Sequence, residues 1–308
     1  MKKSAVYVLL AAILWGTAGI FVRELSALGA DNMTQICTRS LLSALLLLLM
    51  QGREAGSMLR IVPRKLPSAA LGGLIGILGL TLCYNLSMDN LSLSLAAVLL
   101  RLSALFTPAA AWILFREKAG VRTVLCAVMT VIGCLIAGAG NYENGGISVF
   151  GIVCGVGAAL CNSAYVLFSR KLKDVSAMTV TFYGILSVGL CSLPFCDFGT
   201  VAAICASGIK GPALLVLQAL ILSAVPYLLY NKAIRGLKLG LIAVMAALEP
   251  VSATVTGILV YGEMPGIAGT LGLLICLLAV LIVNMDRPAL AERGHKAYRC
   301  VCCETKVN

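Results

Sequence analysis

The chain alternates long apolar runs with short polar connections over nearly its whole length. Each run holds about 20 residues, the length at which an α-helix crosses a bilayer core of roughly 30 Å. The apolar residues are continuous within each run, whereas strands of a membrane barrel would alternate apolar and polar residues over about ten positions. The pattern predicts an all-α integral membrane protein with ten transmembrane helices, at residues 4–22, 33–50, 68–88, 92–115, 121–140, 147–168, 178–197, 211–231, 239–261 and 266–284.

Composition leads to the same class of protein. Hydrophobic residues make up 60% of the chain and charged residues 12%, whereas a soluble domain carries about 25% charged residues. Too few polar residues remain to cover a water-facing surface. The first run follows Lys2 and Lys3, like the apolar part of a signal peptide, but it continues to Val22 without a small-residue cleavage site. We therefore interpret it as the first span, retained in the protein.

The basic residues lie almost entirely on one side of the predicted bundle, and Arg23 and Lys210 alone fall on the other. Cytoplasmic connections are enriched in Lys and Arg, so this asymmetry predicts cytoplasmic termini in the inner (plasma) membrane. The net charge of +11 is then an orientation signal, and we expect a lipid bilayer, and no nucleic acid, as a partner. The cytoplasmic set is Lys2, Lys3, Arg53, Arg60, Arg64, Lys65, Arg116, Lys118, Arg122, Arg170, Lys171, Lys173, Lys232, Arg235, Lys238 and the basic residues after Asp286.

The two halves of the sequence resemble each other when the chain is shifted by 146 residues. Each half holds five spans, and because five is odd the second half enters the membrane from the opposite side. Such inverted repeats are typical of secondary transporters. The predicted units are residues 1–140 and 147–286, followed by a basic cytoplasmic tail at 287–308. The matching residues are Tyr84 with Tyr230, Asn85 with Asn231, Glu117 with Glu263, and Gly120 with Gly266.

Three motifs carry a resemblance to a known family. They are AAILWGTAGIFVREL in the first span, LAAVLLRLSALFTPAAAWILFREKAG in spans 4 and 5, and ALEPVSATVTGILVYGEMPGIAGTLGLLICLLAVLIV in spans 9 and 10. With them the chain resembles an EamA-type member of the drug/metabolite transporter superfamily over residues 4–286. The resemblance implies a central cavity lined by helices 1–4 and 6–9, helices 5 and 10 at the periphery, and export or exchange of small metabolites, often amino acids. One departure is Pro250, whose register in the first half holds Ala104.

Three charged residues lie inside the predicted spans: Arg39, Arg101 and Glu249. Exposed to lipid at the midplane they would together cost about 8–10 kcal/mol, so we expect them to face protein or water. Arg101 is the tenth residue of span 4 and Glu249 the eleventh of span 9, so both lie near the bilayer centre although the two spans enter from opposite sides. Arg39 lies nearer the outer face. Ser252 and Thr256 continue a polar stripe from Glu249, which indicates that this carboxylate looks inward onto a wet cavity.

Arg101 and Glu249 support two interpretations. In the first they bind a zwitterion: Arg101 holds a carboxylate through a charge-assisted hydrogen bond, and Glu249 holds an ammonium group or a proton. In the second they pair with each other and lock spans 4 and 9 together. Both interpretations hold if the two residues pair in the absence of substrate and separate when substrate binds. Pro250 removes a backbone donor beside Glu249 and weakens the helix there.

A second group of polar and aromatic residues lies within or near the ends of spans. Interfacial aromatic residues usually anchor a helix, and inter-helix hydrogen bonds contribute about 0.6 kcal/mol, so each of these residues has a structural interpretation as well. The further candidates for substrate contact are Arg39, Trp15, Tyr84, Asn162, Gln218 and Tyr230, with Tyr165 and Tyr227 beside them.

Other motifs point to structure. Glu117 and Glu263 close corresponding spans, which indicates capping of a loop or a gate, and we favour the structural role. In the tail, His295 and three nearby cysteines are spaced too tightly for a familiar zinc motif, so we predict no metal site. The sequence lacks the phosphate-binding pattern G-x-x-x-x-G-K-[ST], so we expect neither ATP hydrolysis nor another cofactor.

Together these features predict a secondary transporter that exports or exchanges an amino acid or similar zwitterion by alternating access around a midplane cavity. Transport of a sugar, nucleoside or amphiphilic cation is an open alternative, as are intramembrane catalysis and a receptor that transports nothing. Catalysis is the weaker of these because His295 is the only histidine and no aspartate lies deep in a span. One chain contains both halves, so a monomer suffices and a homodimer is allowed.

Overall fold

A computed structural model of the 308-residue chain describes residues 2–52, 56, 59–91, 96, 99–139, 148–262 and 266–284. These residues form helices and their connections, with no β-strand among them, so the all-α prediction is confirmed for this part of the chain. The predicted tail at 287–308, with His295 and its neighbouring cysteines, lies outside the described residues, and so does Glu263.

Membrane-spanning segments account for most of the described chain. Seven helical segments are long and apolar enough to cross a bilayer, and three shorter apolar helices occupy the positions of predicted spans 4, 5 and 10. The protein is therefore a multi-pass integral membrane protein, while the count of ten crossings stays a prediction. The seven are Lys3–Ala27, Asn32–Gln51, Pro63–Met88, Val149–Lys171, Ala177–Phe195, Lys210–Gly236 and Leu239–Tyr261, and the three are Leu99–Phe115, Val121–Ile136 and Ile267–Val283.

Several of these segments combine shorter helical elements, and three contain a stretch of π-helix. The elements in chain order are α1 (Lys2–Gly16), α2 (Ala18–Ala27), α3 (Asn32–Gln51), η2 (Pro63–Lys65), α5 (Leu66–Gly73), the π-helix η3 (Leu74–Gly79), α6 (Leu80–Asn90), α8 (Ser103–Phe115), α9 (Val121–Ala139), α10 (Val149–Lys171), α11 (Ala177–Ser192), η4 (Leu193–Phe195), α12 (Phe198–Ala206), α13 (Lys210–Gln218), the π-helix η5 (Ala219–Ala224), α14 (Val225–Gly236), α15 (Leu239–Met245), α16 (Leu248–Thr256), the π-helix η6 (Gly257–Tyr261) and α17 (Ile267–Asn284).

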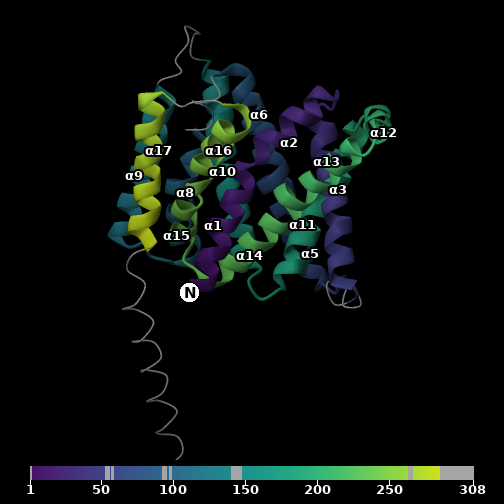
Figure 1. Ribbon diagram of the computed structural model, residues 1–308. Helices are drawn as coiled ribbons and strands as arrows, with labels where there is room; N and C mark the ends of the chain where they lie inside the picture. The colour runs from purple at the N-terminus through teal and green to yellow at the C-terminus, as the bar shows by residue number, and fades with distance from the viewer. Residues whose placement is uncertain are drawn as a thin grey trace, which may run out of the picture.

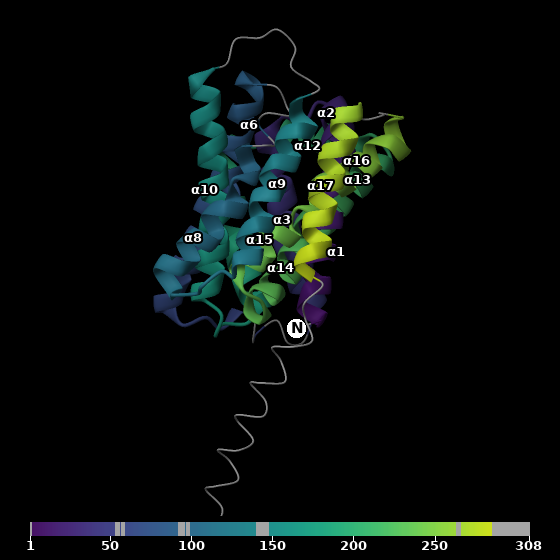
Figure 2. The same cartoon turned by 90° about the vertical axis from the view of Figure 1, so that its left-hand side faces the viewer.

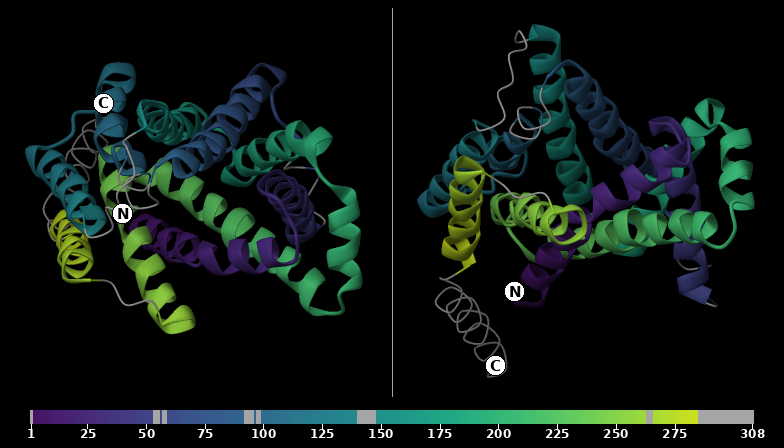
Figure 3. Two further views of the ribbon diagram at one scale, coloured as in Figure 1. Left: turned by 90° about the horizontal axis from the view of Figure 1, so that it is seen from above. Right: turned by 45° about the horizontal axis from the view of Figure 1, so that its top comes forward.

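The helices stand roughly side by side, and α9 and α17 pair along one edge of the bundle (Figures 1 and 2). Seen from above, α1 passes through the middle, while α12 lies at the edge opposite α9 and α17 (Figure 3). The α9–α17 backbones approach closely, since a Cβ on Gly133 would lie 2.7 Å from the carbonyl oxygen of Gly272. Spans 5 and 10 therefore sit at the periphery, as the family resemblance implies.

Spans 4 and 9 run in opposite directions. Glu117, just after the end of α8, accepts a hydrogen bond from the backbone N–H of Leu239, the first residue of α15. Both spans also end in a left-handed residue at corresponding positions, Arg116 with φ 53° and Gly262 with φ 67°. These positions are 146 residues apart, so the same helix ending is built once at each end of the bundle, as an inverted repeat requires.

Irregular helix geometry also recurs in both halves. The π-helices η3 and η5 lie at corresponding places in spans 3 and 8, and π-helical turns are frequently found at functional sites. Spans 4 and 9 are each interrupted near their middle, at Leu102 and at Ala246–Ala247. Interrupted helices in corresponding positions of two halves are the feature that marks binding sites in secondary transporters.

Close packing brings α1 against the helix that carries Glu249. A Cβ on Gly16 would lie 2.4 Å from the hydroxyl oxygen of Ser252, so no larger residue fits at this crossing. The Ser252 hydroxyl donates a hydrogen bond to the carbonyl of Ile13 at 3.0 Å. The glycine within the AAILWGTAG motif thus fixes the distance between α1 and α16.

Candidate functional site

An ion pair joins the two halves inside the bundle. The Arg101 guanidinium lies 3.1 Å from the Glu249 carboxylate (Nη2 to Oε1), with side-chain exposures of 11% and 30%. Arg101 comes from span 4 in the first repeat and Glu249 from span 9 in the second. The structure therefore brings together the two charges that the sequence analysis placed at similar depth, and it contains the contact that the locking interpretation requires.

Both charged residues stand beside the interruptions of their helices. Arg101 directly precedes the turn at Leu102, whose N–H bonds to the carbonyl of Leu99 at 3.1 Å. The N–H of Glu249 bonds to the carbonyl of Ala246 at 3.0 Å. These i→i−3 bonds replace the i→i−4 bonds of a regular α-helix, and Pro250 has no N–H to donate. The local backbone is therefore tighter than an α-helix at each charge.

Four aromatic rings form a cluster next to the pair. Trp15 contacts Tyr227 and Tyr230 edge to face, each at a centroid distance of 5.3 Å. Tyr165 contacts Tyr227 at 5.2 Å and stacks on Tyr230 at 6.4 Å. The Trp15 indole N–H donates to the carbonyl of Leu222 in the π-helix η5 at 3.1 Å. The Tyr165 hydroxyl accepts a hydrogen bond from Asn231 at 2.8 Å. The cluster thus joins α1, α10 and α14 through ring contacts.

The aromatic cluster and the charges share one electrostatic neighbourhood. Tyr84 and Tyr230, the two tyrosines related by the repeat, each lie within electrostatic range of both Arg101 and Glu249. Tyr227 lies within the same range of Arg39 and Glu249. Trp15 belongs to the same group through its ring contacts. Predicted site residues from both repeats therefore converge on one region of the bundle.

The amide candidates differ in their surroundings. Asn162 donates to the hydroxyl of Ser103 at 3.1 Å, and Ser103 occupies the register that Glu249 has in the second half. Gln218 is 1% exposed, and its side-chain Nε2 has no hydrogen-bond partner among the described residues. The Ser103 contact could not be predicted, because a serine in an apolar span usually bonds within its own helix.

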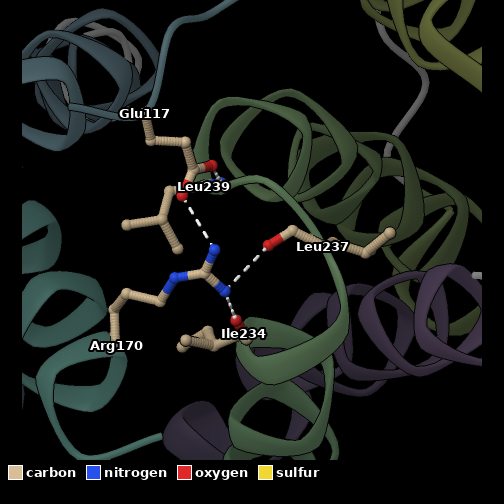
Figure 4. Close-up of polar contacts among 5 residues, drawn as sticks. All are labelled: Glu117, Arg170, Ile234, Leu237 and Leu239. Atoms are coloured by element: carbon tan, nitrogen blue, oxygen red, sulfur yellow. Dashed lines mark hydrogen bonds and ion pairs between the residues drawn. The ribbon is translucent and has the colours of Figure 1, made fainter. Parts of the chain in front are cut away.

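A second polar junction lies at the end of the bundle where α1 begins (Figure 4). The Glu117 carboxylate accepts from Arg170 at 2.8 Å and from the N–H of Leu239 at 2.6 Å. Arg170 also donates to the carbonyl oxygens of Ile234 and Leu237. Glu117 therefore caps the start of span 9 across the interface of the two halves. The sequence analysis favoured a structural role for Glu117 but counted Arg170 only among the basic loop residues.

Comparison with known proteins identifies the family. The model of the EamA-like transporter family matches residues 2–139 and again residues 149–285. The chain belongs to the EamA-like transporter family. The two EamA matches contain one member each of the Arg101–Glu249 pair and of the Glu117–Arg170 junction.

Individual relatives agree with that assignment. An inner membrane transporter of Salmonella typhimurium, YicL, described as uncharacterized, is 25% identical over 295 residues, covering 92% of this chain and 96% of YicL. A transporter of Archaeoglobus fulgidus, also described as uncharacterized, is 26% identical over 285 residues, with coverage of 92% and 96%. A protein of known crystal structure superposes with a TM-score of 0.71 at 15% identity, covering 92% of this chain and 97% of its own. The last likeness concerns the fold alone.

Proposed function

We propose that this EamA protein is a secondary transporter that exports or exchanges a small zwitterionic metabolite, an amino acid or a close analogue. The observation that carries the proposal is the Arg101–Glu249 contact, in which each repeat supplies one charge beside an interrupted helix. A zwitterion has two charges of the complementary signs, so its carboxylate replaces Glu249 at Arg101 and its ammonium group replaces Arg101 at Glu249. Substrate and ion pair are then alternative partners for the same two side chains.

The surroundings of the pair support the same chemistry. The Trp15–Tyr165–Tyr227–Tyr230 cluster offers an apolar wall for a substrate side chain. Rocking of one repeat against the other, with the pair at their interface, gives alternating access without further machinery. We assign the protein to the inner membrane, by analogy with the Salmonella relative, with the basic connections and both termini in the cytoplasm.

Coupling to protons is a further part of the proposal. When substrate separates the pair, the Glu249 carboxylate loses its arginine partner, and a proton or an ammonium group takes that place. Glu249 is the one carboxylate at this place among the described residues, so it is the group that we assign to proton exchange. Membership of a transporter family leads us to propose transport rather than intramembrane catalysis.

The direct test is counterflow in proteoliposomes with a labelled amino-acid panel at two pH values. We expect exchange of some amino acids by the wild-type protein, none by Arg101→Ala, and loss of any pH effect in Glu249→Gln. Arg60→Ala is the matched control, because Arg60 is exposed and lies outside the spans. If well-folded wild-type protein exchanges no member of the panel, the amino-acid proposal is wrong and sugars, nucleosides and amphiphilic cations come next.

A further inference from the structure

The charges inside the bundle do not balance. Arg39, Arg101 and Glu249 are the charged residues within the described spans away from their ends, and the two arginines face one carboxylate. Glu249 is 3.1 Å from Arg101, whereas no acidic residue of the described chain pairs with Arg39. The interior therefore carries a net charge of +1 when its ion pair is formed.

Arg39 and Arg235 are the two arginines whose Nε is buried without a hydrogen-bond partner among the described residues. Arg235 lies near the end of α14, within electrostatic range of Asp174, whereas Arg39 is half-buried near the middle of α3. Arg101, Arg170 and Lys210, by contrast, each contact a carboxylate. Removing an unpaired cation from water is costly, and intramembrane charges are retained mainly where they serve a function. Arg39 thus lacks an anionic partner among the described residues, and a bound anion would supply one.

A second unpartnered donor lies on the neighbouring helix. The hydroxyl of Ser43 is 2.5 Å from the carbonyl oxygen of Arg39 and 2.8 Å from that of Ala219, so α3 and η5 touch one turn from Arg39. Gln218 directly precedes Ala219 and is almost fully buried, and its Nε2 has no partner among the described residues. Burying an amide N–H without an acceptor is unfavourable, so the contact between these two helices carries two unmet donor groups and no unmet acid.

Arg39 is connected to the central site through Tyr227. Tyr227 lies within electrostatic range of both Arg39 and Glu249, and its ring contacts Trp15 and Tyr165. A small molecule held at the Arg101–Glu249 pair would therefore lie near Tyr227, the residue that Arg39 and Glu249 have in common. This adjacency makes Arg39 part of the substrate site rather than a separate surface feature.

We propose that Arg39 forms an anion subsite of the central site, with Gln218 as a neighbouring donor, and that the transported metabolite is a small organic anion of net charge −1. The proposal rests on the transport function proposed above and deepens it. A simple zwitterion leaves Arg39 uncompensated, whereas a second carboxylate on the substrate neutralises the site and fits the planar fork of the guanidinium. An acidic amino acid has this set of groups: one ammonium and two carboxylates.

Substrate pairs that differ in charge but hardly in shape test this assignment. Proteoliposome counterflow would compare glutamate with glutamine, and succinamate with the neutral diamide succinamide, for wild-type protein, Arg39→Gln, Arg39→Lys and the exposed control Arg60→Gln. We expect the wild type to prefer the more anionic member of a pair by about tenfold or more in half-saturating concentration. Arg39→Gln loses that preference, Arg39→Lys keeps most of it because the charge remains, and Arg60→Gln leaves it unchanged.

The outcomes separate this inference from the proposed function. Equal exchange of glutamate and glutamine by the wild type overturns the anion subsite while amino-acid transport stands, and this holds even if Arg39→Gln does not fold. If Arg39→Gln loses exchange of glutamate and glutamine equally, the anion subsite is overturned as well. Exchange of succinamate that depends on Arg39, without exchange of any amino acid, keeps the subsite and refutes the zwitterion proposal. Absence of all exchange refutes both.

Discussion

Of the ion pairs that connect the two repeats within the described residues, Glu117–Arg170 and Arg101–Glu249 are the more buried ones, and they differ in how completely their groups are used. At the junction where α1 begins, both Glu117 oxygens accept hydrogen bonds, and Arg170 bonds to two backbone carbonyls besides the carboxylate. At the centre, Arg101 and Glu249 share a contact of 3.1 Å, and 30% of the Glu249 side chain stays exposed. Both carboxylate oxygens of the Glu117–Arg170 pair are hydrogen-bonded, whereas the Arg101–Glu249 pair has capacity for a further partner.

This difference distinguishes a structural contact, which holds the helices in place, from a binding site, which can accept a ligand. Groups whose hydrogen-bonding capacity is filled by backbone cannot exchange partners without breaking the chain's own contacts, so they stabilise one arrangement of helices. A pair with capacity left over can open toward a ligand at little cost. The inverted repeat places charged residues both at the junction and at the centre. The role of each pair follows from how much of its hydrogen-bonding capacity is already filled.

The largest effect is expected from removing both central charges at once. Arg101→Gln with Glu249→Gln should abolish counterflow, while the unfolding free energy stays within about 1 kcal/mol of the wild type, because a neutral pair replaces a charged one without leaving an unpaired ion. Arg101→Gln alone should cost about 1–3 kcal/mol, less than a fully buried pair because Glu249 is partly exposed. Thermal unfolding in detergent and counterflow check these values. Exchange by the double variant would show that the pair is only scaffold.

Neutralising both charges of the junction should instead lower stability and leave transport almost unchanged. Glu117→Gln with Arg170→Gln loses up to four polar contacts, each contributing about 0.5–1.5 kcal/mol, so the free energy of unfolding should fall by up to about 2–6 kcal/mol. The half-saturating substrate concentration should hardly change, since no contact of the junction reaches the central pair. A charge swap, Glu117→Arg with Arg170→Glu, should not rescue stability, because the N–H of Leu239 then meets a donor. If the charge swap restored stability, the junction would act only as an ion pair, and its hydrogen bonds to the backbone would not matter.

Much of this architecture follows from sequence periodicity. Apolar runs of about 20 residues identify the segments that cross the membrane, and the 146-residue shift relates features such as the helix endings at Arg116 and Gly262. The all-α class could be predicted because a bilayer leaves few ways to satisfy the backbone. The EamA family could be predicted because the motifs in spans 1, 4, 5, 9 and 10 resemble it. The Arg101–Glu249 contact was one of two predicted outcomes, since similar depth and opposite sign brought the two charges close.

Other features of the site could not be read from the residues. Hydropathy gives depth but little information on rotation about a helix axis, so Arg39 and Arg101 look alike in the sequence although only one has a carboxylate partner. The role of Arg170 depends on carbonyls exposed where the α14 helix ends, a property of the backbone rather than of any side chain. The π-helices likewise depend on packing that no local motif specifies.

A smaller effect on stability, with a clear effect on transport, is expected at Asn162. Asn162→Ala removes the hydrogen bond to Ser103, which should change the unfolding free energy by about 0.6 kcal/mol. Counterflow should fall severalfold, because Ser103 belongs to the interrupted segment that positions Arg101. Thr107→Ala is the matched control, since it removes a similar bond to Ser163 one turn further along. Equal changes in transport for both variants would contradict a positioning role of Asn162.

The smallest effect is expected at the exposed ion pair of Lys65 and Asp174, which tests whether saturation or mere charge pairing matters. The hydrogen bond from Lys65 holds the pKa of Asp174 below its ordinary value, so the pair stabilises the fold at neutral pH and ceases to do so as the pH falls through that lowered pKa. Asp174→Asn should therefore lower the thermal midpoint slightly at pH 7 and not at all at the acid end of the titration, with a smaller change than any variant above. Melting curves of the two proteins across this range should converge in acid. A gap that persisted there would mean that Asp174 acts through something other than its charge, and that an exposed pair can have the structural role assigned here to Glu117 and Arg170.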